Sequence, residues 1–257
     1  MSSTVLLERD DHCGIITINR PEQRNALNTT ILQDLAEAFR TCLLDNAVHV
    51  IILTGAGDRA FCAGADLNQF VEDIPVDIRS ANLHAFVDLF STMHHATKPI
   101  IGAVQGHALA GGFGLALSCD IVIAAEHATF GTPEIGIGLW PMMIMSIINR
   151  HVGPKRAMEL YLTGRRLSAE EACSWGLVNR VVPGSTVLQE ARSLASTLEG
   201  WSPSILSMGR SAFQHIDSLD FDRSLEYLHG KLVQLATSSD AQEGARAFLE
   251  KRTPKFS

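Results

Sequence analysis

Short apolar runs, each typical of a buried strand, recur along the first half of the chain. They predict strands at residues 4–8, 14–19, 49–55, 100–104 and 120–125, the first two joined by a turn at Asp10-Asp11. Asn28 or Thr29 is placed to cap a helix, and a second helix is expected at 80–96. The first helix has an apolar face made of Ile31, Leu35, Phe39 and Leu43. Strands that alternate with helices predict an α/β fold with parallel strands.

The periodicity becomes helical after about Pro141. The helical segments are 142–152, 154–162, 168–175 and most of 186–252, interrupted by one strand at 177–182. We therefore expect an α/β core, residues 1–198, followed by a helical C-terminal region, residues 199–257, that makes oligomer contacts. Packing of each tail helix against the core of its own chain is the alternative explanation for its apolar face.

Residues 99–125 form a nearly apolar stretch whose length suits a membrane span. The stretch contains five glycines together with Gln105, His107 and Asp120, which a lipid-exposed helix would not favour. We therefore expect a buried strand, a glycine turn, a buried helix and a second buried strand, and no membrane span.

Composition narrows the classes of partner. The 257 residues are 46% hydrophobic and 19% charged, which indicates a globular protein with a large core. The net charge is −7 and no cluster of Lys and Arg occurs, so a nucleic-acid partner is not expected. Five cysteines without a CxxC pair argue against a disulfide framework and against a metal site. The first residues lack the pattern of a secretory signal, so a cytoplasmic location is expected.

Residues 55–60, GAGDRA, fit the glycine pattern of a dinucleotide-binding turn. Such a turn must open directly into a helix, so that the phosphates lie at the helix N-terminus. The following residues, FCAGAD, are a second turn instead, which argues against a nicotinamide cofactor. The ten histidines show no metalloprotease spacing, and no GxSxG elbow of a serine hydrolase is present.

Two glycine turns follow successive predicted strands, at residues 61–66 and 110–114. Ligands in α/β sheets lie beyond the carboxyl ends of the strands, and small residues let a backbone approach them closely. The N–H groups of Ala65 and Gly111 are therefore expected to face one pocket, where together they would form an oxyanion hole. Tight packing between helix and strand is the better explanation of either turn alone, whereas the two turns together favour a functional site.

Glu134 lies in an otherwise apolar segment, residues 130–136. Burial would raise the pKa of its carboxyl and suit it to proton transfer. A structural role, as a helix cap or in a salt bridge, is the alternative.

These motifs, in this order, resemble the enoyl-CoA hydratase/isomerase family, also called the crotonase family. The segments that carry the resemblance are RPEQRNALN, FCAGADL, PIIGAVQGHALAGGFGLAL, CDIVIAA, ATFGTPEIGIG, LTGRRLSAEEACSWGLVNRVV and AFLEKRTPKF. The resemblance implies a spiral of ββα turns and a trailing helical region that forms trimers, often paired into hexamers. It also implies an acyl-CoA thioester substrate, and no cofactor beyond the coenzyme A of that substrate.

The resemblance assigns roles to individual residues. Ala65 and Gly111 match the oxyanion-hole positions, and Glu134 matches one of the two glutamates of family hydratases. Substrate-binding positions are matched by Arg24, Ala26, Ala63, Asp66, Leu67, Asn68, Gly114, Phe248 and Lys251. Of these, Phe248 and Lys251 match residues that reach the adenine end of coenzyme A, sometimes from a neighbouring subunit. Asp66 is expected mainly to fix its own loop through backbone hydrogen bonds.

One departure from the family pattern bears on the reaction. The other hydratase glutamate would stand three residues after Gly111, where this chain has Gly114. Glycine is expected to leave a gap there, and one carboxylate suits the movement of one proton between two carbons better than the addition of water. We therefore expect Δ3 to Δ2 double-bond isomerisation, with two alternatives. These are a hydratase or dehydratase, and an acyl-CoA-binding protein with little turnover. Methionines 142, 143 and 145 are expected to form either an adaptable wall for the acyl tail or ordinary core packing.

Overall fold

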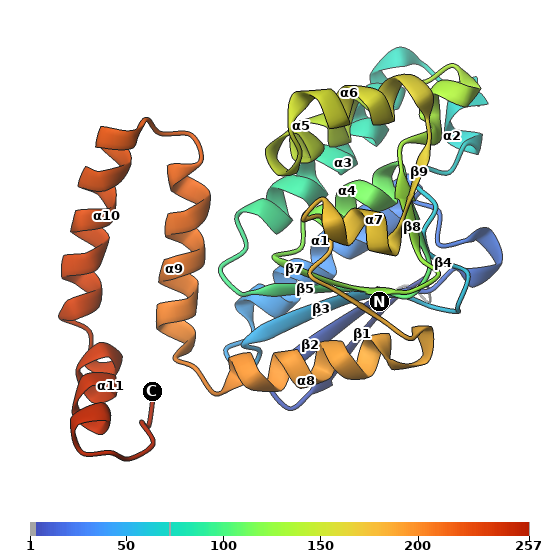
Figure 1. Ribbon diagram of the computed structural model, residues 1–257. Helices are drawn as coiled ribbons and strands as arrows, with labels where there is room; N and C mark the ends of the chain where they lie inside the picture. Colours follow the sequence, from blue (N-terminus) through green and yellow to red (C-terminus); the bar gives the residue numbers. More distant parts are fainter. Residues whose placement is uncertain (1–3, 72, 257) are drawn as a thin grey trace.

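The computed structural model describes residues 4–71 and 73–256 and contains two sheets. The larger sheet has the order β1-β2-β3-β5-β7-β10, with β1 (Val5–Asp10), β2 (Cys13–Ile18), β3 (Val50–Gly55), β5 (Ile100–Val104), β7 (Ile121–Ala125) and β10 (Arg180–Val182). The smaller sheet has the order β4-β6-β8-β9, with β4 (Ala60–Cys62), β6 (His107–Leu109), β8 (Thr129–Gly131) and β9 (Arg166–Ser168). Figure 1 shows the two sheets within the core of the molecule.

The described helices follow the strands in a regular order. They are α1 (Thr29–Leu44), α2 (Asn68–Val71), α3 (Val76–His94), α4 (Gly111–Leu117), α5 (Met142–His151), α6 (Pro154–Thr163), α7 (Ala169–Ser174), α8 (Val187–Glu199), α9 (Pro203–Ile216), α10 (Phe221–Ala236) and α11 (Ser239–Leu249). Three short 3₁₀ helices are η1 (Pro21–Gln23), η2 (Pro133–Ile137) and η3 (Gly184–Thr186). Each of the strands β3, β5 and β7 is followed by a short strand of the smaller sheet and then by a helical segment, which is the expected spiral of ββα turns.

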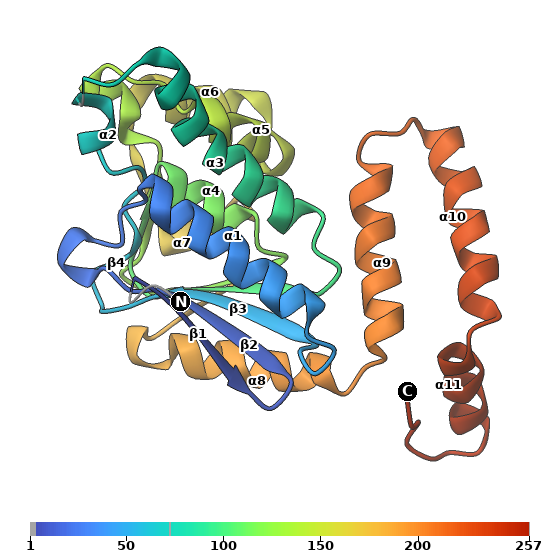
Figure 2. The ribbon, with the colours of Figure 1, turned by 180° about the vertical axis from the view of Figure 1, so that it is seen from behind.

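The larger sheet is parallel from β2 to β10, and its central strands are buried on both faces. Helix α1 packs against β1 and β2 on one face, while α8 packs against β2, β3, β5 and β7 on the other (Figures 1 and 2). Helices on both faces explain why these strands are continuous apolar runs. The predicted cap of α1 is confirmed, because the Asn28 side chain accepts a hydrogen bond from the Ile31 N–H.

Several predicted boundaries were wrong. Helix α3 begins at Val76, four residues before the expected start, and the turn between the first two strands is at Asp11-His12, with Asp11 at φ +50°. The segment 55–66, expected to be a loop, contains β4. The smaller sheet was not predicted at all, because its strands have three residues each and carry no measurable alternation.

Helices α9, α10 and α11 form an arm that projects from the core, with α9 between the core and α10 (Figures 1 and 2). Arg210 of α9 holds the arm to the core. Its guanidinium pairs with the Asp120 carboxylate at 2.8 Å and donates to the carbonyl oxygens of Met93 and Ala96 near the C-terminal end of α3. The arm exposes large apolar side chains at Phe213, Phe221, Leu225, Leu232, Val233, Phe248 and Leu249, and Trp201 just before α9 is exposed as well. No helix within the described residues is long and apolar enough to cross a membrane.

Candidate active site

Three loops meet at the carboxyl edge of the smaller sheet. Strand β6 pairs in parallel with β4 on one side and with β8 on the other. The N–H of Ala110 extends this pairing by donating to the Gly131 carbonyl oxygen at 2.9 Å. Ala65, Gly111 and Glu134 follow β4, β6 and β8 by two or three residues each, so the fold brings the three predicted catalytic residues to one edge.

The Ala65 N–H is left without a partner by the backbone around it. Leu27 forms a parallel bridge with Ala65, in which the Leu27 N–H donates to Gly64 at 2.8 Å and the Leu27 carbonyl accepts from Asp66 at 2.7 Å. In a parallel bridge the N–H of the middle residue points away from the partner strand. Within the described residues, no acceptor is found for the Ala65 N–H.

Gly111 is the first residue of α4, and the first N–H groups of a helix have no partner inside it. The described part of the chain supplies no other acceptor for this N–H. Ala110, which precedes it, has φ +49° and ψ −125°, a sparsely populated conformation that aims the start of α4. The Gly111 N–H is therefore also available to a ligand.

The two turns are in direct contact, and Gly64 makes this possible. Gly64 has φ +96°, and a Cβ atom there would lie 2.6 Å from Ala110 Cβ and 3.2 Å from the Gly111 nitrogen. Only glycine fits such a position without displacing the α4 turn. This contact brings the loops that carry the two free N–H groups close together, as an oxyanion hole requires.

Asp66 fixes the loop after β4, as predicted. Its Oδ1 accepts hydrogen bonds from the Asn68 N–H at 3.2 Å and from the Asn68 side-chain amide at 2.9 Å. Arg20 approaches the other oxygen at 3.5 Å. Both Asp66 and Asn68 are thus occupied in holding the turn that presents Ala65.

The segment that contains Arg24 and Ala26 runs beside this loop. The Ala63 N–H donates to the Arg24 carbonyl at 3.0 Å, Arg24 is exposed at φ +51°, and Leu67 is also exposed. Asn25, which sequence reasoning missed, is fully buried, and its amide donates to the carbonyls of Ala56 and Ala60. The sequence signal for this role is an asparagine that directly follows the polar residues 22–24.

Glu134 lies in η2, whose position is fixed by neighbouring backbone. The buried Thr132 hydroxyl donates to the Leu160 carbonyl at 3.0 Å, and the Leu139 N–H donates to the Glu134 carbonyl at 3.0 Å. Burial raises the pKa of the Glu134 carboxyl to about 7, opposed by a hydrogen bond from its own backbone N–H. Its Oε2 is buried and lacks a hydrogen-bond partner among the described residues. A carboxyl in this state can accept and return a proton near neutral pH.

The expected gap at Gly114 is not present. A Cβ atom on Gly114 would lie 2.4 Å from Ile144 Cγ2 and 3.1 Å from Phe90 Cζ. Gly114 is itself buried, with Ile144 and Phe90 lying over it. The interpretation was wrong because Ile144 lies thirty residues along the chain, on a helix whose approach to α4 the sequence does not reveal.

Phe248 and Lys251 are not brought to this edge within one chain. Both are exposed, Phe248 in α11 and Lys251 just after it, on the arm beyond α9 (Figure 1). They can contribute only to a site on another subunit or after a large movement of the arm.

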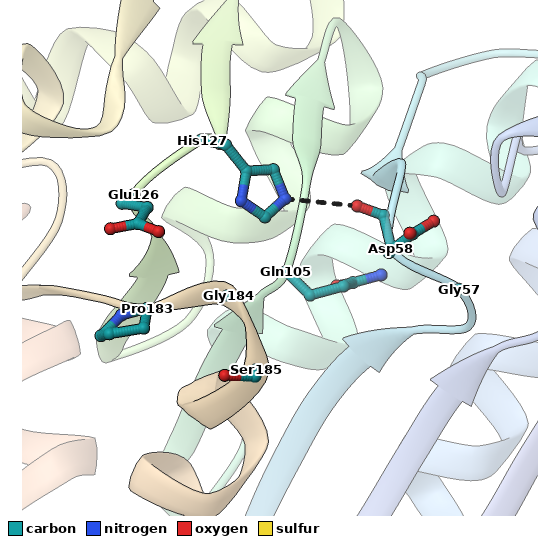
Figure 3. Close-up of a pocket in the computed structure, with 8 residues that line it drawn as sticks. All are labelled: Gly57, Asp58, Gln105, Glu126, His127, Pro183, Gly184 and Ser185. Atoms are coloured by element: carbon teal, nitrogen blue, oxygen red, sulfur yellow. Dashed lines mark hydrogen bonds between the residues drawn. The ribbon is translucent and has the colours of Figure 1, made fainter.

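A separate hollow of about 460 Å³ lies at the carboxyl edge of the larger sheet (Figure 3). Its lining residues are Gly57, Asp58, Gln105, Glu126, His127, Pro183, Gly184 and Ser185. Figure 3 shows the His127 ring turned toward the Asp58 carbonyl, with Nε2 at 3.4 Å. Gly57 belongs to the dinucleotide-like motif, but strand β4 follows this turn where a phosphate-binding helix would have to begin. Among the described residues, no group of three or more His, Cys, Asp or Glu is placed to hold a metal ion.

Comparison with known proteins shows which family this chain belongs to. Residues 8–257 match the family model described as Enoyl-CoA hydratase/isomerase. The chain belongs to this family. A probable enoyl-CoA hydratase of Mycobacterium bovis is 39% identical over 254 residues, covering 98% of this chain and 97% of that protein. The 2,3-dehydroadipyl-CoA hydratase of Escherichia coli is 35% identical over 256 residues, covering 99% and 98%.

Solved structures agree with the family assignment. The crystal structure of an enoyl-CoA hydratase from Mycobacterium smegmatis superposes with a TM-score of 0.95 at 30% identity, over 99% of each chain. The crotonase-like α/β fold expected from the sequence motifs is therefore confirmed. Membership of the enoyl-CoA hydratase/isomerase family also makes this chain an acyl-CoA enzyme.

Proposed function

We propose that this enzyme isomerises 3-enoyl-CoA thioesters to 2-enoyl-CoA thioesters, with Glu134 as the single proton shuttle. The ionised Glu134 carboxylate removes a proton from C2 of the substrate, the C3–C4 double bond shifts to C2–C3, and the same carboxyl returns the proton to C4. The reaction is redox-neutral and needs no cofactor beyond the coenzyme A of the substrate.

The N–H groups of Ala65 and Gly111 would hold the thioester oxygen during this transfer. Negative charge moves onto that oxygen when the C2 proton leaves, and two fixed donors stabilise the resulting enolate. The availability of both N–H groups and the contact between their loops support this role. Arg24, Ala26, Ala63 and Leu67 would hold the coenzyme A portion beside them.

The close packing of Ile144 and Phe90 against Gly114 is the observation that favours isomerisation. The three loops at this edge carry two acids, Asp66 and Glu134, and Asp66 is engaged by Asn68 and Arg20. Ile144 and Phe90 occupy the direction in which a side chain at position 114 would point. One free carboxyl can carry a proton between carbons, whereas hydration requires a water molecule to be oriented and activated as well.

Hydration is the second candidate, because the named relatives are hydratases. The assay that separates the two uses 3-enoyl-CoA and 2-enoyl-CoA of equal chain length. We expect kcat/KM for the 3-enoyl substrate to exceed that for hydration of the 2-enoyl substrate by about 10²-fold or more, which is the usual contribution of general base catalysis. A ratio of one or less would establish the hydratase instead. Turnover of neither substrate would favour an acyl-CoA-binding protein.

We propose further that the arm assembles the protein into trimers or hexamers, in which Phe248 and Lys251 reach the coenzyme A of a neighbouring subunit. Helix α10 buries none of its residues within one chain, although it carries Phe221, Leu225, Leu232 and Val233 on its surface. Exposed apolar residues in contiguous groups mark protein–protein contacts.

Light scattering at micromolar concentration is expected to give the mass of three or six chains. Leu225→Glu combined with Leu232→Glu should shift the mass toward the monomer, because charges would be buried without partners. Glu226→Gln combined with Gln234→Glu, at two exposed positions of the same helix, serves as the control. A monomeric unmodified protein would refute this assembly.

A further inference from the structure

The face of α4 that carries Gly111 and Gly114 is covered by side chains from two other helices. A Cβ atom on Gly111 would lie 3.3 Å from Phe86 Cε1, and one on Gly114 would meet Phe90 and Ile144. The Phe86 and Phe90 rings of α3 stack with their centroids 6.2 Å apart, and Ile144 of α5 is only 3% exposed. The result is a continuous apolar wall that begins at the first residue of α4.

The backbone polar groups of Gly114, behind this wall, are already hydrogen-bonded. The Gly114 carbonyl accepts from the Ser118 hydroxyl at 2.8 Å and from the Ser118 N–H at 3.0 Å, and the Gly114 N–H donates to Ala110 at 3.2 Å. A water molecule held in a protein typically needs two to four polar partners. Neither the backbone of Gly114 nor the side chains over it offer one.

We infer that Ile144, together with Phe90, determines reaction specificity: the two side chains fill the place beside Gly114 where a second acid or an activated water would stand. Proton transfer by Glu134 needs nothing at that place, whereas water addition does. This inference rests on the proposed isomerase function and names the residues that enforce it. Two features then act together: α4 has glycine where family hydratases have the second glutamate, and Ile144 of α5 fills the space that this glutamate would occupy.

The steric part can be tested without any activity measurement. Gly114→Ala adds only the atom that would meet Ile144 Cγ2 at 2.4 Å, so overpacking should lower the melting temperature by about 2–10 °C. Ile144→Ala removes the obstructing methyl group and is itself destabilising because it leaves a cavity. In the double variant the added methyl group enters that cavity. The decrease in its melting temperature should therefore be clearly smaller than the sum of the decreases in the two single variants. Additive decreases in melting temperature would show that Ile144 does not block the space beside Gly114.

The specificity part is tested by hydration of 2-enoyl-CoA. Gly114→Glu alone should gain no hydratase activity, because Ile144 blocks the new side chain. Gly114→Glu combined with Ile144→Ala should hydrate at least about tenfold faster in kcat/KM than either single variant, the low end of what a working general base supplies. Gly114→Gln combined with Ile144→Ala matches the size of the side chain but lacks the carboxyl, and it should show no such gain.

The outcomes separate this inference from the proposed function. A 3-enoyl to 2-enoyl ratio of one or less in the unmodified protein overturns the isomerase and, with it, the role of the wall in specificity. A high ratio in the unmodified protein, with no gain of hydration in a folded Gly114→Glu and Ile144→Ala double variant, overturns the wall alone. A gain in the carboxyl variant that its glutamine control lacks supports the inference. If this double variant does not fold, Gly114→Asp combined with Ile144→Ala decides, because it places a smaller carboxyl in the same space and should hydrate at least about tenfold faster than Gly114→Asn combined with Ile144→Ala.

Discussion

Replacement of Glu134 by glutamine is expected to lower kcat for 3-enoyl-CoA by at least about 10²-fold, because a positioned proton-transfer group typically contributes 10²–10⁴. The change preserves the size of the side chain, so KM should change little. Glu126→Gln is the matched control, since Glu126 is an exposed residue just after β7 and lines the separate hollow of Figure 3. Near-full activity of the Glu134 variant on every enoyl-CoA tested would exclude Glu134 as the shuttle.

The pH dependence of kcat/KM, compared between the unmodified protein and Glu134→Gln, tests the role of Glu134 independently. Only the ionised carboxylate can remove the C2 proton, and burial raises the pKa of Glu134 to about 7. In the unmodified protein kcat/KM should therefore rise with pH and level off above about pH 7, whereas the residual activity of Glu134→Gln should lack this rise. A plateau reached already near pH 5 would contradict the raised pKa.

The contribution of Glu134 to the stability of the fold should depend on pH in the opposite direction to the activity. The folded-state pKa lies above the ordinary value of 4.5, so folding favours the protonated carboxyl. Its contribution to stability is complete below about pH 4.5 and is lost as the pH rises through about 7. Glu134→Gln should therefore melt above the unmodified protein at pH 8, and the difference should shrink toward pH 4.5.

Replacement of Gly111 by proline is expected to lower kcat/KM by about 10²–10³-fold, the usual cost of losing one oxyanion donor. Proline has no N–H, and the first helical position is the one that tolerates it best. The loss should fall mainly on kcat, because negative charge on the thioester oxygen develops in the transition state.

Gly111→Ala is the matched control, since it keeps the N–H. Its Cβ atom would lie 3.3 Å from Phe86 Cε1 and 3.4 Å from Leu27 Cδ1, a tight fit that should cost much less activity than the proline. Ala110 has a conformation that is unfavourable before proline, so circular dichroism and the melting temperature of both variants must accompany the kinetics. Equal activity of two folded variants would show that the Gly111 N–H does not bind the thioester oxygen.

The elements that could be predicted from the amino-acid sequence are those whose signal is local. The apolar runs of β3, β5 and β7 predicted buried parallel strands, because strands covered on both faces need apolar side chains throughout. Asn28 predicted the start of α1, because its side chain reaches an N–H only three residues away. Asp66 predicted the hydrogen bonds that hold its own turn, and the small residues around Ala65 and Gly111 marked where backbone approaches backbone.

The remaining features depend on contacts between segments that are far apart in the sequence. Strands β4, β6, β8 and β9 exist through their neighbours, because three residues gain order only from pairing. The pKa of Glu134 depends on burial by surrounding segments, which local sequence does not contain. Gly114 shows most plainly what could not be predicted from the sequence. The absence of a side chain at this position was visible in the sequence, but Ile144, which fills the space, comes from another helix. Whether a glycine leaves a gap or permits a close contact is decided by packing between elements, and packing was the information that the sequence lacked.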